Sequence, residues 1–143
     1  MSPPPTKSVL LVDNDFGFLI LAMDAIRATT SVAIAFQIAL DGAEAINYLR
    51  GEVEYTDRAR YPLPDLVLSQ MNLTGMSGLD LLAWIKRQPQ FQDLPVILMY
   101  SEQDAVSANE AQQLGANLIL SKPVSPQSSY DFSKQVLDLL FST

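Results

Sequence analysis

Four short apolar runs, none interrupted by a polar residue, constrain the fold more than any other feature of this sequence. They cover residues 9–12, 66–68, 96–99 and 118–120. Strands that helices cover on both faces have continuous apolar runs, whereas strands with one wet face alternate. A fifth, less regular run over 33–40 fits a strand nearer the sheet edge. The runs therefore predict a parallel β-sheet buried between two layers of helices.

The segments between the runs have the spacing of amphipathic helices. An amphipathic helix is predicted over 16–28, after an N-cap at Asp15, because the apolar residues Phe16, Leu19, Ile20 and Met23 recur at helical spacing. Strand and helix then alternate five times along the chain. Because crossovers between parallel strands are right-handed, this order predicts an open α/β sheet with helices on both faces.

Four later helices are predicted from their start and stop signals. Their candidate N-caps are Asp41, Ser77, Asp104 and Ser125, and Gly115 is placed to end the fourth helix at the C′ position. The one long connection, over 51–64, is polar and irregular, which predicts an exposed loop.

Composition limits the chemistry that this chain can perform. Its 143 residues suit one domain, expected over 8–142, after a Pro-rich flexible tail over 1–7. A net charge of −7 disfavours nucleic acids and anionic membrane surfaces as partners. The sequence has no His and no Cys, which excludes His-based catalysis, disulfides and zinc-finger sites. Without an apolar stretch of about 20 residues or a signal peptide, we expect a cytoplasmic protein.

Polar residues follow each predicted strand. Ligands of such sheets collect at the carboxyl ends of the strands, so these residues form the candidate site. In chain order they are Asp13, Asn14, Asp15, Ser69, Gln70, Asn72, Tyr100, Ser101, Lys122 and Pro123.

Four stretches in this order resemble the receiver domain of bacterial response regulators. They are LLVDND (10–15), PDLVLSQMNLTGMSG (64–78), PVILMYS (95–101) and LGANLILSKPV (114–124), and the match runs from about Ser8 to Phe141. The resemblance implies a flavodoxin-like (βα)5 fold with strand order 2-1-3-4-5, and a role in two-component or phosphorelay signalling. The long loop before Pro64 is similar to that of single-domain regulators that serve phytochrome-type kinases. No output domain is expected after the last helix.

The resemblance assigns roles to positions where this chain departs from the family pattern. The phosphoacceptor position, an aspartate in the family, holds Gln70. Asn14 stands at the position where the family has its second acidic residue after strand 1, which is a metal ligand. The backbone carbonyl of Asn72 would complete the metal shell. Tyr100 replaces a Ser or Thr, and Ile119 stands at the aromatic switch position.

Only Asp13 and Lys122 keep the family chemistry, and Lys122 precedes Pro123, a candidate for a cis peptide bond. Phosphotransfer to a receiver needs a carboxylate nucleophile and a hard cation, whereas Gln70 offers an uncharged amide. We therefore expect no catalytic residue, no cofactor and no enzyme activity, and at most weak metal binding at Asp13 and Asn72. Lys122 is instead expected to pair with Asp13 and to donate to the Gln70 oxygen, which leaves a neutral cluster.

Three functions remain open. The favoured one is a pseudo-receiver that binds a histidine kinase or another two-component protein near its first, fourth and fifth helices, with a possible homodimer through helix 4, strand 5 and helix 5. The second is a working response regulator phosphorylated at an atypical residue. The third, a flavin or nucleotide enzyme, is disfavoured because Asp13 and Asp15 would repel phosphate. Whether Gln70 reflects a deliberately fixed state or decay of an unused site stays open.

Overall fold

The computed structural model describes residues 6–101 and 108–142 and contains one five-stranded parallel sheet. The strand order is β2-β1-β3-β4-β5, which confirms the predicted flavodoxin-like fold. The strands are β1 (Lys7–Val12), β2 (Ile34–Ala39), β3 (Leu66–Gln70), β4 (Val96–Tyr100) and β5 (Leu118–Ser121).

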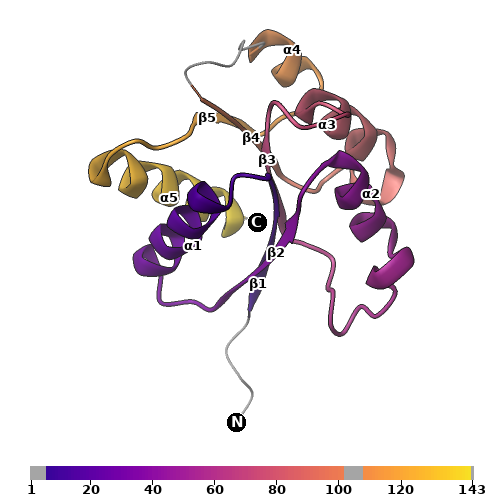
Figure 1. Ribbon diagram of the computed structural model, residues 1–143, viewed down its shortest axis with the longest axis horizontal. Coiled ribbons are helices and arrows are strands. Elements are labelled where there is room, and N and C mark those ends of the chain that lie inside the picture. The colour runs from indigo at the N-terminus through magenta and orange to yellow at the C-terminus, as the bar shows by residue number, and fades with distance from the viewer. Residues whose placement is uncertain (1–5, 102–107, 143) are drawn as a thin grey trace.

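Helices cover both faces of this sheet. The α-helices are α1 (Phe16–Thr29), α2 (Gly42–Arg50), α3 (Gly78–Arg87), α4 (Ala108–Gln113) and α5 (Pro126–Leu140), with short 3-10 turns η1 (Val53–Tyr55) and η2 (Pro89–Phe91). Figure 1 shows α1 and α5 on one side of the sheet and α2 and α3 on the other. None of the described helices is both long and apolar enough to span a membrane.

The central strands contribute side chains to two separate hydrophobic cores, one on each face of the sheet. Leu10 and Val12 of β1 pack in the core under α2 and α3, while Val9 and Leu11 pack in the core under α1 and α5. All four side chains are fully buried. Successive side chains of a strand point to opposite faces, so covering both faces requires the uninterrupted apolar runs seen in the sequence.

Local capping sets the helix ends where the sequence predicts them. The side chains of Asp15, Asp41, Ser77 and Ser125 each accept a hydrogen bond from a backbone N–H of the first helical turn. Gly115 follows α4 with φ of 103°, and the N–H groups of Gly115 and Ala116 donate to Gln112 and Ala111. These two bonds form a Schellman motif, in which glycine tolerates the left-handed backbone. The predicted cap Asp104 lies outside the described residues.

The predicted apolar stripe of α1 is only half correct, because Leu19 is buried and Met23 packs against the core under α1 and α5, while its other two residues are exposed. The helix buries Leu19, Ala22 and Ile26, whereas Phe16 and Ile20 are each 57% exposed. Several apolar faces are possible on a helix this rich in apolar residues, and the contact with α5 selects one of them. Phe16 and Ile20 therefore remain as large apolar side chains on the surface.

Two boundary predictions also need correction. Lys7, assigned to the tail, begins β1, and its N–H donates to the Ala33 carbonyl; residues 1–5 of the predicted tail lie outside the described residues. The connection over 51–64 is not a plain exposed loop, because η1 interrupts it and Tyr55 is buried. The rings of Tyr48, Tyr55 and Tyr61 pack together, with centroids 4.9 to 6.2 Å apart. Aromatic contacts therefore hold this connection against α2.

Candidate functional site at the carboxyl edge of the sheet

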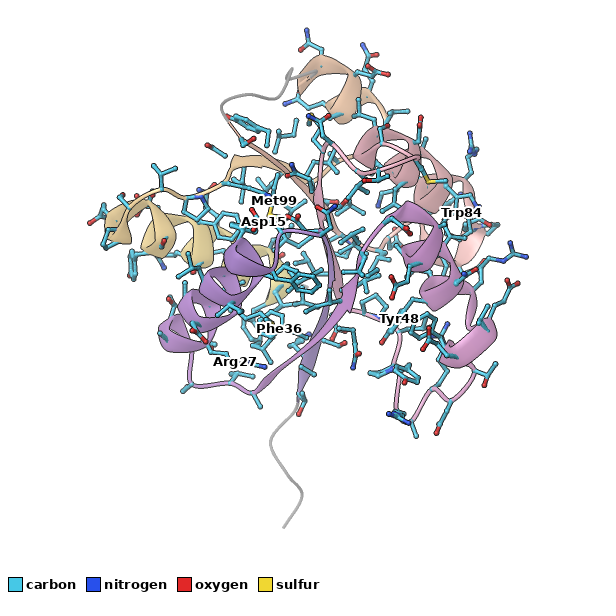
Figure 2. The ribbon with its side chains drawn as sticks, in the orientation of Figure 1. Asp15, Arg27, Phe36, Tyr48, Trp84 and Met99 are labelled. Atoms are coloured by element: carbon cyan, nitrogen blue, oxygen red, sulfur yellow. The ribbon has the colours of Figure 1, made fainter. Side chains whose placement is uncertain are left out.

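The ends of β1, β3, β4 and β5 meet at one edge of the sheet. The register pairs Gln70 with Met99 and Tyr100 with Ser121. Backbone hydrogen bonds continue past the strands, because the N–H of Asp13 donates to Ala39 and that of Lys122 donates to Tyr100. Asp15 and Met99 lie at this end of the sheet in Figure 2. The sheet itself therefore fixes the backbone positions of the predicted site.

Asp13 and Lys122 form a buried ion pair at this edge. The Lys122 Nζ lies 2.8 Å from Asp13 Oδ2, which is the pairing that the sequence predicts. The side chain of Asp13 is only 1% exposed and that of Lys122 only 12%. The second carboxylate oxygen, Asp13 Oδ1, accepts a hydrogen bond of 2.9 Å from the Asp15 N–H. Both oxygens of this carboxylate are thus engaged by the protein, as a buried charge requires.

Phe18 completes this cluster, and the sequence analysis missed it. Its ring centroid lies 4.5 Å from the Lys122 Nζ, within the range of a cation–π interaction. The N–H of Phe18 donates to Asp15 Oδ1 at 3.1 Å, so the helix cap places this residue. The sequence position of Phe18 could have indicated this role, because a residue in the first helical turn after β1 lies next to the carboxyl ends of the strands.

The end of β3 is packed too closely for any side chain on the residue that opens α3. A Cβ atom added to Gly78 would lie 2.5 Å from the Gln70 carbonyl oxygen and 2.9 Å from the Met71 Cα. The Gly78 N–H donates to the Met71 carbonyl at 2.8 Å, and buried Ser69 donates its hydroxyl to the Gln70 carbonyl. Glycine is required here because backbone meets backbone. Gln70 is half-buried at the end of this rigid strand.

The remaining predicted site residues are dispersed around the edge. Asn14 and Asn72 are exposed, and Tyr100 is half-buried at the end of β4. Ile119, at the predicted switch position, packs against the core under α2 and α3. The expected cis bond before Pro123 is wrong, since none of the described peptide bonds is cis. The trans form of a bond to proline is favoured by about 0.5–1 kcal/mol on its own.

Asp65 does not belong to this edge. Asp65 lies at the opposite end of β3, where its carboxylate accepts from the Ser8 N–H at 2.8 Å. Within 6–101 and 108–142, no group of three or more His, Cys, Asp or Glu side chains could hold a metal ion.

Comparison with known proteins places this chain in a family. The model of the response regulator receiver domain matches residues 9–131. The response regulator Rcp1 of Synechocystis sp. is 29% identical over 121 residues, which cover 82% of this chain and 78% of Rcp1. The polar-differentiation response regulator DivK of Brucella ovis is 30% identical over 120 residues, which cover 84% of this chain and 87% of DivK.

Solved structures agree with these sequence matches. The phosphorylated cyanobacterial phytochrome response regulator RcpA superposes with a TM-score of 0.83 and 26% identity, covering 96% of both chains. The bacteriophytochrome response regulator AtBRR superposes with a TM-score of 0.75 and 25% identity, covering 98% of both chains. The strand order and the match to the family model both indicate a receiver domain. The chain therefore belongs to the response regulator receiver domain family.

Proposed function

We propose that this chain is a two-component signalling module that works through protein–protein interaction without phosphorylation, as a pseudo-receiver. The observation that carries this proposal is Gln70 at the end of β3, the position where the family resemblance places the phosphoacceptor. An amide nitrogen gives its lone pair to the carbonyl and offers no carboxylate nucleophile for phosphoryl transfer. On this proposal the chain is not an enzyme and catalyses no transfer of its own.

The metal that receivers use does not fit the residues present. Mg²⁺ is held by carboxylate and carbonyl oxygens in near-octahedral geometry. Asp13 Oδ2 is paired with Lys122 and Asp13 Oδ1 with a backbone N–H, while the Asp15 carboxylate accepts from the Phe18 N–H. With Asn14 in place of a second acid, we derive no reaction step through a metal ion.

An exposed apolar surface supports a role in binding a protein partner. Ile20 and Leu21 on α1 are 57% and 69% exposed, and Val124 in the connection from β5 to α5 is 86% exposed. Leu21, Pro123 and Val124 line one hollow of about 420 Å³. Apolar side chains gathered at one hollow mark interaction sites more often than scattered ones do. A histidine kinase or another two-component protein is the partner class that we propose; self-association through α4, β5 and α5 stays a prediction.

A second candidate, phosphorylation at an atypical residue, has one observation in its favour. RcpA, whose structure this chain resembles, was solved in a phosphorylated form. The scaffold is therefore of a kind that can carry a phosphoryl group in another protein.

Intact mass spectrometry separates the two candidates. The purified chain is incubated with Mg²⁺ and acetyl phosphate and then weighed, beside a receiver that has an aspartate at the position of Gln70. We expect the control to gain one phosphoryl group and this chain to gain none. A stoichiometric phosphoryl adduct on this chain would contradict the pseudo-receiver, and fragmentation would then locate the atypical acceptor.

A further inference from the structure

Two groups from different parts of the fold, Asp13 and Phe18, enclose the Lys122 ammonium at the carboxyl edge of the sheet. Asp13 follows β1, Lys122 follows β5, and Phe18 lies in the first turn of α1. The Lys122 Nζ is 2.8 Å from Asp13 Oδ2 and 4.5 Å from the centroid of the Phe18 ring. The ammonium is thus held between a carboxylate and the negative face of an aromatic ring.

This enclosure compensates charges that burial would otherwise destabilise. A carboxylate that is 1% exposed loses nearly all of its hydration, and it remains charged only with close partners. The ammonium and the Asp15 N–H are those partners for Asp13. Any other cation that bound Asp13 would first have to displace the Lys122 ammonium from the carboxylate and from the ring.

Phe18 is held firmly enough to keep the ammonium in place. On one side its backbone N–H is bound by the Asp15 side chain. On the other side its ring packs edge-to-face on Phe132 of α5, with centroids 6.2 Å apart and an interplanar angle of 81°. Phe132 is part of α5, so the Phe18 ring cannot swing away without disturbing the contact between α1 and α5.

Building on the pseudo-receiver proposed above, we propose that the Lys122 ammonium is a built-in cation that occupies the cation position of the pocket and excludes divalent metal, with Phe18 as the residue that locks it there. Loss of the second acid at Asn14 is then not the only barrier to metal binding. Restoring that acid alone leaves Asp13 neutralised by Lys122. Releasing the lock makes the Asp13 carboxylate available to a divalent ion.

Mn²⁺ titration by isothermal calorimetry tests this lock. All samples carry Asn14→Asp, an exposed change that supplies a second carboxylate. Phe18→Leu added to this background should tighten Mn²⁺ binding about threefold to tenfold, as expected when a cation–π contact to the competing ammonium is lost. Phe16→Leu is the matched control, because Phe16 lies in the same helical turn but is 57% exposed. It should leave the Mn²⁺ affinity unchanged.

Lys122→Met in the same background should tighten Mn²⁺ binding further, because it removes the competing charge altogether. If that variant does not fold, with Asp13 left buried and unpaired, the comparison of Phe18→Leu with Phe16→Leu decides alone. Equal Mn²⁺ affinities for these two would overturn the lock. The proposed function fails on a different result, a phosphoryl adduct on the unaltered chain, so one can be wrong while the other stands.

Discussion

At the scale of single residues, the side chain at position 70 decides whether the pocket is electrostatically quiet. Gln70 is uncharged, and the nearby Asp13 already has its countercharge in Lys122. A second carboxylate at position 70 would repel Asp13 and compete for the same ammonium. The neutral amide therefore avoids the like-charge strain that a second acid would bring.

The first prediction follows from this balance. Gln70→Asp should lower the melting temperature in the absence of divalent ions by several degrees, because about 1 kcal/mol shifts Tm by roughly 3–5 °C in a domain of this size. Thermal denaturation followed by circular dichroism measures the effect. Gln70→Asn is the control, since asparagine matches aspartate in shape without its charge. A melting temperature for the aspartate variant at or above that of the asparagine variant would count against a stabilising amide.

At the scale of elements, the connection between α2 and β3 is organised by buried phenols. Tyr48 donates its hydroxyl to the Pro62 carbonyl at 2.7 Å, and Tyr55 donates to Glu44 Oε1 at 2.7 Å. Burial raises the pKa of Tyr48 to about 12, with the Arg58 charge opposing the shift. Burial, followed by the hydrogen bond to Glu44, also raises the pKa of Tyr55. Figure 2 shows Tyr48 on the α2 side of the molecule, away from the candidate site.

These pKa shifts predict an alkaline loss of stability. Between the ordinary tyrosine pKa of 10.0 and about 12, the unfolded chain releases the Tyr48 proton while the folded chain keeps it. The unfolded state then binds fewer protons, so the free energy of unfolding falls as pH rises. Tyr48 should contribute a loss of about 1 kcal/mol between pH 9 and pH 11.

Urea unfolding at the two pH values measures this loss. Tyr48→Phe should flatten the decline, whereas Tyr130→Phe, which changes an exposed ring, should retain it. If the free energy of unfolding falls equally with pH in the Tyr48→Phe and Tyr130→Phe variants, the buried Tyr48 hydroxyl is not the source of the alkaline loss of stability.

At the scale of the whole molecule, the chain combines the receiver fold with a buried ion pair at the carboxyl edge and an exposed apolar surface. The apolar surface runs from Leu21 of α1 to Val124, close to the chain segment that carries Lys122. Phe18 and Phe132 connect the pocket to the packing of α1 on α5. The pocket and this surface therefore share a packing contact between α1 and α5.

Leu21→Asp tests the surface without disturbing the fold. Because Leu21 is 69% exposed, the free energy of unfolding should change by less than about 0.5 kcal/mol. Recovery of histidine kinases or other two-component proteins by the immobilised chain should fall at least several-fold, measured by mass spectrometry of the bound fraction. Leu63→Asp is the matched control, since Leu63 is 50% exposed in a different segment. Equal recovery of partners by the Leu21→Asp and Leu63→Asp variants would show that α1 is not part of the docking surface.

The sequence alone determined the parallel α/β class, most helix caps and the identity of the residue at position 70, and the family resemblance supplied the strand order. Apolar runs and caps are local signals, because a strand buried on both faces and an N-cap bond are set within a few residues. The tertiary structure alone decided which face of α1 is buried, that Phe18 covers the Lys122 ammonium, and that three tyrosines pin the connection over 51–64. These features depend on contacts between segments distant in the chain, where several local choices are nearly equal in free energy and packing selects one.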